Sequence, residues 1–430
     1  MSISVPIGTY IAVSAVMFLE YAVWGAWAPV LAARLLGPLK MSGKQTGWIY
    51  ATLPLACIFA PFVTGWLADR WVNAEYILAV AHLIGAVLLF TAARIQNFSR
   101  LFVVMLFYSI CYAGTLPLAN TVLFRHAAAD QGKVFIWAPI AWALAGYFLT
   151  GWRNLRKGEG DGSDCLKLAA VLSLAMVVAS LFAPGTMPKA KEMPIVETLA
   201  LLKGLDFLVF VVVSFVVAGM MQFYFLGSAQ FMMDRGISGR NVPAAMAVAQ
   251  AAQTVATVFV LWEAALMFFG LPKEQENVLA LLGFKWTLTL GAACWLLMYV
   301  FYVAVHSRAL IVVSQVLHGL AYVMFMIVGQ VYVNAVAPVS IQSTAQALIF
   351  AATTGVGLFL GTQLAGIVMD QSKSEGKFQW SKIWAVPLAI VLVGTLVLAA
   401  IFQGSVPKNE SSPPANSKAQ IGLTVDRQPS

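Results

Sequence analysis

Residues 65–71, Gly65-Trp66-Leu67-Ala68-Asp69-Arg70-Trp71, place a carboxylate and a guanidinium side by side between two long apolar segments. The preceding segment, 48–67, carries no charge, and the following one, 76–93, contains a single histidine, His82. Neither charged group is tolerated in hydrocarbon, so the pair must lie at a membrane surface or be matched by partners. The stretch therefore predicts a charged turn between two membrane-spanning helices.

The whole chain has the composition of a polytopic membrane protein. Of its 430 residues, 60% are hydrophobic and 10% are charged, with a mean hydropathy of +0.83, whereas soluble domains have about 25% charged residues. The net charge of +8 is spread over short loops and the C-terminal tail. This pattern indicates contact with water and lipid headgroups and no nucleic-acid binding. The four cysteines lack metal-ligand or redox spacing, so we expect neither a metal site nor a cofactor.

Apolar segments of about 20 residues can cross a bilayer as helices. The chain has twelve such segments: 7–33, 44–67, 75–95, 100–123, 134–152, 164–184, 205–232, 241–266, 284–305, 308–333, 342–368 and 383–403. The first is too long for a signal peptide and carries Glu20, so we expect it to be retained. The sequence predicts an all-α membrane protein with twelve transmembrane helices.

A proline-rich, charged linker divides the twelve segments six and six. We expect an N-terminal six-helix half at 1–185, a linker at 186–204 and a C-terminal half at 205–403. Residues 404–430 have the polar, proline-containing composition of a disordered tail.

Polar groups inside spans are costly and are therefore candidate functional residues. Glu20 shares a helix face with Trp24 and Trp27, at spacings of four and seven residues. Carboxylates in membrane helices are typical of proton relays, which makes Glu20 a proton-coupling candidate. A hydrogen bond that holds neighbouring helices together is an equally good explanation.

A second group of polar and aromatic residues lies in the middle of later spans. Amides can both donate to and accept from a neutral polar solute, and aromatic rings can stack on a base or cover a sugar. Each residue could instead serve helix packing. The candidates are Gln222, Gln250, Gln253, His318, Tyr322, Phe135 and Trp142, whereas His82 and Asn120 are better explained as structural hydrogen-bonding groups.

The order Gly-x-Leu-Ala-Asp-Arg between the second and third spans resembles the signature loop of the major facilitator superfamily. Within it, the chain resembles the nucleoside–proton symporters in Val23-Trp24-Gly25-Ala26-Trp27, in His82, and in Leu116-Pro117-Leu118-Ala119-Asn120-Thr121. The resemblance implies alternating access between two six-helix halves, a monomer, and an inner (cytoplasmic) membrane location with both termini cytoplasmic. Loop lysines and arginines do not favour this orientation. Gly65, Asp69 and Arg70 would form a conformational latch, in which Gly65 allows a close backbone contact.

The resemblance also implies a substrate pocket. The residues of this chain that match the pocket of the family are Phe135, Pro139, Trp142, Gln222, Phe225, Gln250, Gln253, His318 and Tyr322. Three charged positions of the family differ: this chain has Phe135 for an arginine, Gln253 for a glutamate and Val323 for an aspartate. Glu20, where relatives tend to have a neutral amide, is then the replacement proton carrier.

These observations predict a secondary transporter for nucleosides or a related neutral solute, coupled to protons. A uniporter or symporter for another small solute, such as a sugar, and a non-transporting membrane sensor are the alternatives. The sequence shows no paired metal motif, nucleophile constellation or phosphate-binding loop, so we expect no catalytic residue and no enzyme.

Overall fold

The computed structural model describes residues 3, 5–127, 130–158, 160–187, 199–262, 269–272, 275, 277–338, 345 and 348–406. The prediction of a disordered tail falls almost wholly outside them, as does most of the predicted linker. Within the described part, eleven helices are long and apolar enough to cross a membrane, which confirms an all-α membrane protein.

The helices of the first half are α1 (Ile7–Trp27), α2 (Leu31–Leu36), α3 (Gly43–Cys57), α4 (Ala60–Arg70), α5 (Ala74–Ala92), α6 (Phe98–His126), α7 (Gln131–Phe135), α8 (Trp137–Leu155) and α9 (Asp164–Leu181). Those of the second half are η2 (Leu201–Lys203), α11 (Leu205–Asp234), α12 (Val242–Leu261), α13 (Val278–Ala304), α14 (Arg308–Val313), α15 (Gln315–Ala321), η5 (Tyr322–Ile327), α16 (Val328–Val336), η7 (Ala351–Gly357), α18 (Leu358–Gln371) and α19 (Trp380–Ala400). A two-stranded antiparallel hairpin, β1 (Lys373–Ser374) and β2 (Lys377–Phe378), joins the last two.

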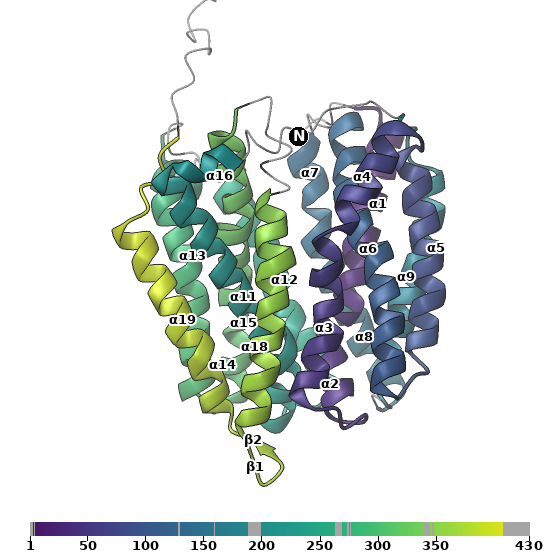
Figure 1. Cartoon of the computed structure of the whole chain (residues 1–430), viewed down its shortest axis with the longest axis vertical. Helices are drawn as coiled ribbons and strands as arrows, with labels where there is room; N and C mark the ends of the chain where they lie inside the picture. Colours follow the sequence, from purple (N-terminus) through teal and green to yellow (C-terminus); the bar gives the residue numbers. More distant parts are fainter. Residues whose placement is uncertain are drawn as a thin grey trace, which may run out of the picture.

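The helices form two bundles that stand side by side (Figure 1). In the first bundle α1 packs on α8 and α9, and α5 packs on α6 and α9; in the second, α13 packs on α19, and α11 packs on α18 and α19. The bundles meet where α3 lies against α18 and α8 lies against α12. Large apolar side chains such as Val87, Phe107, Phe148 and Leu396 are exposed on the outer surface, as expected for contact with lipid.

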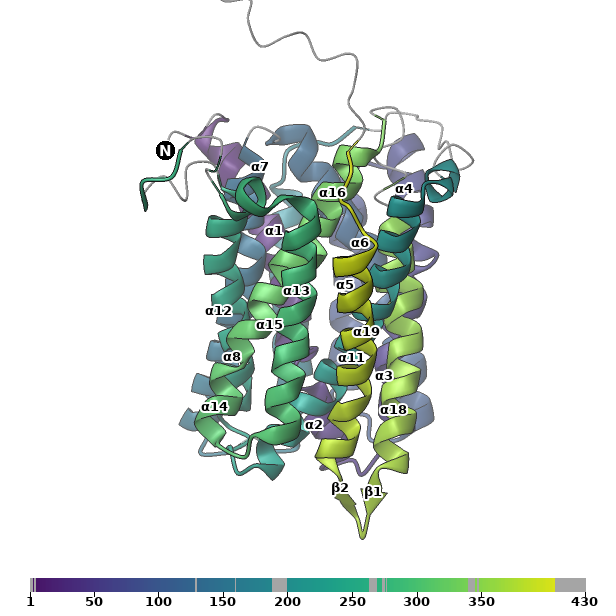
Figure 2. The same cartoon turned by 90° about the vertical axis from the view of Figure 1, so that its left-hand side faces the viewer.

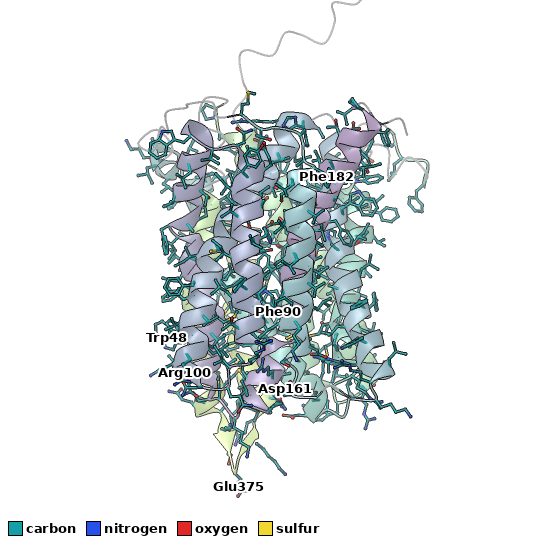
Figure 3. All side chains as sticks on the ribbon, turned by 90° about the vertical axis from the view of Figure 1, so that its right-hand side faces the viewer. Trp48, Phe90, Arg100, Asp161, Phe182 and Glu375 are labelled. Carbon is teal, nitrogen blue, oxygen red and sulfur yellow. The ribbon has the colours of Figure 1, made fainter. Side chains whose placement is uncertain are left out.

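The two ends of the molecule differ. The N-terminus and the end of α19 lie at one end, here called the terminal face, and β1–β2 projects from the other, the hairpin face (Figures 1 and 2). Phe182 lies toward the terminal face, whereas Trp48, Arg100, Asp161 and Glu375 lie toward the hairpin face (Figure 3).

The second predicted span, 44–67, is not one helix. It is broken at Ile58 and Phe59, between α3 and α4. Pro61 lies in the first turn of α4, where a residue without a backbone N–H is tolerated because that N–H would have no partner in the helix. The proline therefore fits the start of a new helix rather than the middle of a long one.

The prediction of a turn at the charged pair is wrong. Asp69 and Arg70 are the last two residues of α4, and the chain leaves the helix only at Trp71. The helix continues because its backbone N–H groups still find acceptors one turn back, as the bond from Trp71 N–H to the Leu67 carbonyl shows.

The expected close contact at Gly65 is not formed in this structure. A Cβ placed on Gly65 would meet no atom within 4 Å, so no neighbouring helix requires a glycine there. The tight contact in this region is made by Gly114 of α6, whose Cβ position falls against the side chain of Thr64. The Thr64 hydroxyl also donates to the Gly114 carbonyl, at 3.0 Å. The small residue that lets α4 and α6 approach is thus on α6.

Candidate solute site and buried polar clusters

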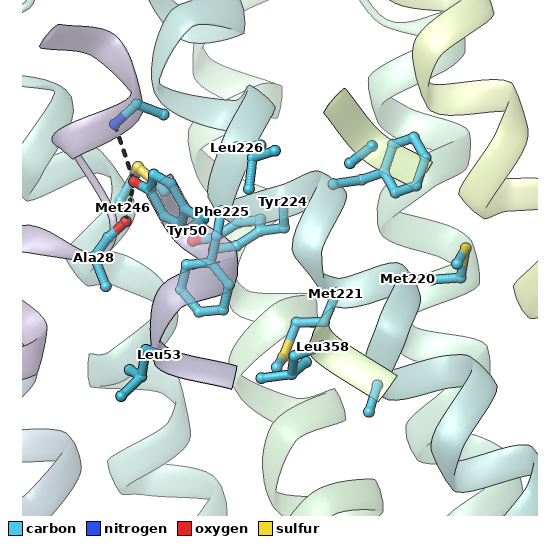
Figure 4. Close-up of a cluster of buried hydrophobic side chains, with 14 of the residues drawn as sticks. Ala28, Tyr50, Leu53, Met220, Met221, Tyr224, Phe225, Leu226, Met246 and Leu358 are labelled. Atoms are coloured by element: carbon cyan, nitrogen blue, oxygen red, sulfur yellow. Dashed lines mark hydrogen bonds between the residues drawn. The ribbon is translucent and has the colours of Figure 1, made fainter. Parts of the chain in front are cut away.

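A narrow cavity between the two bundles is lined mainly by aromatic and apolar side chains. Both halves contribute, and the lining consists of Trp24, Trp27, Ala28, Tyr50, Leu53, Pro54, Gln222, Phe225, Thr354 and Leu358. Its free space is that of about one water molecule, so a larger solute would need the bundles to separate. Figure 4 shows Tyr50, Leu53, Phe225 and Leu358 converging here from α3, α11 and α18.

Gln222 is the amide of this cavity. Together with Phe225, three residues further along α11, it faces the lining of Trp24 and Trp27. Gln222 is 4% exposed, and no described residue forms a hydrogen bond with its side chain. A buried amide without protein partners retains its full capacity to donate and to accept, so Gln222 is suited to a polar solute or a water.

Trp142 connects the two halves beside the cavity. Its ring centroid lies 5.1 Å from that of Trp24 and 6.4 Å from that of Phe225. Gly25 makes room for it, since a Cβ there would lie 2.7 Å from the indole ring. The sequence-predicted Trp142, Gln222 and Phe225 are therefore brought together, with Trp24 as a fourth neighbour.

The break between α1 and α2 is fixed by Tyr50. Its hydroxyl donates to the Ala28 carbonyl at 2.6 Å and accepts from the Ala32 N–H at 2.9 Å, as the dashed lines in Figure 4 mark. These bonds satisfy backbone groups that the interrupted helix leaves free. The tyrosine thus holds in place the segment that carries Trp24 and Trp27.

His318 lies behind this cavity, inside the second half. Its ring stacks on Tyr224 with centroids 3.9 Å apart, and Trp295 Nε1 donates to His318 Nδ1 at 3.1 Å. Since an indole N–H is only a donor, Nδ1 must be an acceptor and the proton of the neutral ring sits on Nε2. Nε2 is buried and has no hydrogen-bond partner among the described residues.

Three further candidates lie in the second half but do not line the cavity. Gln250 and Gln253 are each 6% exposed on one face of α12, and α12 packs against α15, which carries His318. Tyr322 begins η5, a π-helical segment, and is half-buried. Val323, at a family aspartate position, is fully buried in the same segment.

Phe135 lies apart from these residues. It ends α7 and packs, half-buried, against the apolar cluster of the first half that contains Met17 and Leu118. A ring in this place is stabilised by burial, and it does not line the cavity between the bundles.

Glu20 lies within the first half and is fully buried. Its Oε2 is 3.0 Å from His82 Nε2 on α5, and its Oε1 accepts a hydrogen bond of 2.7 Å from the Thr115 hydroxyl on α6. Tyr112 donates to the Glu20 backbone carbonyl at 2.6 Å. A buried carboxylate is stable only with such partners. The Tyr112 ring in turn contacts Trp24, at 6.4 Å, so the cluster adjoins the cavity lining.

The predicted latch stays a prediction. The side chains of Asp69 and Arg70 lie outside the described part of the structure, and only their helical backbone is placed.

Sequence reasoning overlooked three polar contributors. Thr115 and Thr354 lie in apolar spans that gave no reason to select them. Asp370, at the end of α18, accepts two backbone hydrogen bonds from the other half. Its place after a glycine-rich apolar run was a usable signal, because a carboxylate there must find water or a donor. Among the described residues, no cluster of His, Cys, Asp or Glu could hold a metal ion.

The chain is similar to known transporters over almost its whole length. Residues 7–406 match a family model described as Nucleoside H+ symporter. The chain is 29% identical to the putative nucleoside transporter YegT of Escherichia coli over 406 residues, covering 88% of this chain and 91% of that protein. It is 26% identical to the E. coli nucleoside permease NupG over 405 residues, covering 90% and 94%.

Solved structures share the fold. The crystal structure of the nucleoside transporter NupG matches with a TM-score of 0.75 and 23% identity, over 91% of this chain and 98% of that one. A D-xylose–proton symporter matches with a TM-score of 0.69 and 13% identity, over 93% and 99%. These likenesses confirm the expected major facilitator fold, and the permease relatives confirm a transporter rather than an enzyme.

Proposed function

Because this chain belongs to the nucleoside H+ symporter family, we propose that it carries nucleosides or a closely related neutral solute across the cytoplasmic membrane. It is an integral multi-pass membrane protein of the major facilitator fold. The proposal places both termini in the cytoplasm and the hairpin face outside, with the chain acting as a monomer and the two six-helix halves, 1–185 and 205–403, as the moving units.

The observation that carries the substrate proposal is the amide of Gln222, which bonds to no described residue and lies among the rings of Trp24, Trp142 and Phe225. Rings contributed by both halves can cover the two faces of a planar base, while the amide meets a polar edge. Binding between the halves is what alternating access requires. Gln250, Gln253, His318 and Tyr322 are the further contacts proposed, and Phe135 would take part only if α7 moves.

The test is uptake of labelled uridine and adenosine into proteoliposomes containing the purified protein. We expect saturable uptake of at least one of them, and a loss of about tenfold in Gln222→Leu, since a buried hydrogen bond to the solute is removed. Gln315→Leu is the control: this amide is also buried but bonds to Tyr302 inside the second half. Absence of uptake by folded protein would refute the nucleoside assignment.

Proton coupling is proposed to reside at Glu20. Its carboxylate is paired with His82 and Thr115 in the first half, and the Tyr112 ring connects the cluster to Trp24 at the cavity. A carboxylate–histidine pair inside a bundle is typical of proton pathways. A proton bound there would alter hydrogen bonds next to the cavity lining.

An inward proton gradient should therefore drive accumulation of the solute above equilibrium, and a protonophore should abolish it. Glu20→Gln is expected to remove gradient-driven accumulation while leaving exchange of solute largely intact. Glu75→Gln is the matched control, since Glu75 is buried but bonds to Asn73 and the Thr186 N–H near the terminal face. If Glu20→Gln still concentrates solute, the proton site is elsewhere; equilibration without accumulation in the unmodified protein would indicate a uniporter.

A further inference from the structure

The N-terminus of α3, at the hairpin face, is capped in two different ways. The first backbone N–H groups of a helix have no acceptor within it. Here the Ser42 hydroxyl accepts from the Gln45 N–H, and the Gln45 side chain accepts from the Ser42 N–H, both at 3.0 Å. This capping box uses two donors and leaves the N–H groups of Gly43 and Lys44 to be satisfied from elsewhere.

Asp370, at the end of α18 in the other half, supplies the missing acceptors. Its Oδ1 accepts from the Gly43 N–H at 2.6 Å and its Oδ2 from the Lys44 N–H at 2.8 Å. A carboxylate at a helix N-terminus is further stabilised by the helix dipole. One side chain of the second half thus completes a helix of the first half.

The backbones at this contact are too close for side chains. A Cβ on Gly43 would lie 2.8 Å from the Gly366 carbonyl oxygen, and a Cβ on Gly47 would lie 2.6 Å from that of Thr362. The glycines let α3 and α18 approach until the Asp370 carboxylate reaches the helix end. Any movement that separates the halves at this face must break both hydrogen bonds.

At the second contact between the halves at this face, the cap of the helix is neutral. The Ala244 N–H in the first turn of α12 donates to the Thr150 hydroxyl at 2.9 Å, and Arg153 donates to the Gly239 carbonyl at 3.2 Å. Here too a helix start in one half is capped from the other, but by a neutral group. Hydrogen bonds to charged groups are about twice as strong as neutral ones. Asp370 makes two of them, at 2.6 and 2.8 Å, whereas Arg153 makes one to the Gly239 carbonyl, at 3.2 Å, so the stronger cap is that of α3.

We propose that Asp370 is a detachable cap of α3 that holds the hairpin face closed and is released when that face opens. This inference rests on the proposed alternating access. Asp370 is a positioning residue, since it sets the relative stability of the closed and open states without contacting the solute cavity.

The chain contains a matched control in Asp206 at the start of α11. Its two carboxylate oxygens accept from the Gln403 and Ser405 N–H groups at 2.7 and 2.8 Å. The chemistry and distances resemble those of Asp370, but the donors follow directly after α19, and none of these three residues belongs to the first half. Removing Asp206 therefore costs the same kind of bonds without affecting the contact between the halves.

The experiment measures the opening of the hairpin face by double electron–electron resonance. Spin labels are attached to Gln96→Cys and Ser374→Cys, two exposed positions on different halves, with the four native cysteines replaced. Asp370→Ala should raise the ratio of long to short distances at least tenfold, since two charge-assisted bonds are lost. Asp370→Asn should give a smaller shift and Asp206→Ala none; size-exclusion profiles verify folding.

Gly47→Leu separates packing from capping, because it obstructs the same contact while leaving Asp370 intact. We expect it to open the face as well. If it does so while Asp370→Ala leaves the distances unchanged, closure depends on packing alone and the proposal is wrong. Equal shifts in Asp370→Ala and Asp206→Ala, or an unmodified protein that is already open, would also overturn it. The distance measurement uses neither solute nor a proton gradient. A failure of nucleoside uptake would therefore contradict the proposed function without affecting the result for the Asp370 cap.

Discussion

Each half of the molecule buries one histidine, and the two histidines have chemically different partners. In the first half His82 lies 3.0 Å from the carboxylate of Glu20, and in the second half His318 accepts a hydrogen bond from the indole of Trp295. A carboxyl group and an imidazole at this distance can share a proton between them, whereas an indole donor requires a neutral ring with its proton on Nε2. The halves share a fold but differ in what their polar interiors can do: the first can hold a proton, and the second offers a fixed donor.

The comparison is tested most strongly by His82→Leu. Removing His82 leaves the buried Glu20 carboxyl with Thr115 as its one side-chain partner among the described residues, and we expect a loss of about 3–5 kcal/mol in unfolding free energy. Denaturant-induced unfolding in detergent micelles, followed by tryptophan fluorescence, measures it. If His82→Leu lowers the unfolding free energy by less than His318→Leu does, the Glu20–His82 interaction is weaker than the hydrogen bond between Trp295 and His318.

Thr115→Val is expected to cost about 1.5–3 kcal/mol, because it removes the hydrogen bond that the threonine donates to Glu20. The isosteric side chain preserves packing, but the Thr115 hydroxyl also lies 2.6 Å from the Tyr112 carbonyl, so the bond to Glu20 is reported by the difference from a variant that loses only a bond to a backbone carbonyl. Thr121→Val on the same helix is the control, since among the described residues its hydroxyl bonds only to the Pro117 carbonyl. Equal effects of both variants would argue against a special role for the Glu20 cluster.

His318→Leu should destabilise by about 1–3 kcal/mol, the cost of leaving the buried Trp295 N–H without an acceptor. No charge is left behind, which is why the effect is smaller than in the first half. The same unfolding assay applies. A loss of 5 kcal/mol would mean that His318 has a charged partner that the present conformation does not display.

Trp295→Phe removes the same hydrogen bond from the donor side and leaves the buried His318 Nδ1 without its donor, so we expect a loss in the same range, about 1–3 kcal/mol. Combined with His318→Leu it should cost less than the two single changes together, because both polar partners are then absent. A double-mutant cycle measures this coupling. Strict additivity would show that the indole does not orient the imidazole.

The sequence predicts the membrane fold well because burial in lipid demands long apolar segments, and these can be counted. It does not reveal the break in the second span, where hydropathy is uninterrupted and only Pro61 marks a new helix start. The π-helical segments η5 and η7 leave no hydropathy signal either, since their residues are as apolar as those of any span.

The sequence predicts which residue types form the candidate site, but it does not predict which of these residues contact one another. Glu20 and His82 are both visible as polar residues in spans, but they are 62 positions apart and only packing pairs them. The resemblance assigns Phe135 and His318 to the same pocket. In this conformation Phe135 packs inside the first half, and His318 packs on Tyr224 and Trp295 inside the second. Asp370 was missed because a carboxylate at the end of a span is ordinarily solvated, and its two donors belong to another helix.

The two π-helical segments bear on how this pocket could change in evolution. A π turn closes over five residues where an α turn closes over four, so each segment accommodates one additional residue within a span. Tyr322 opens one segment, and Thr354, at the cavity, lies in the other. Deleting one residue there would restore a regular α-helix, and because the wide turn absorbs the additional residue, the rest of the span would keep nearly its present direction. A single codon gained or lost would thus change the side chains within the segment, such as Thr354 at the cavity, while the rest of the bundle keeps its packing.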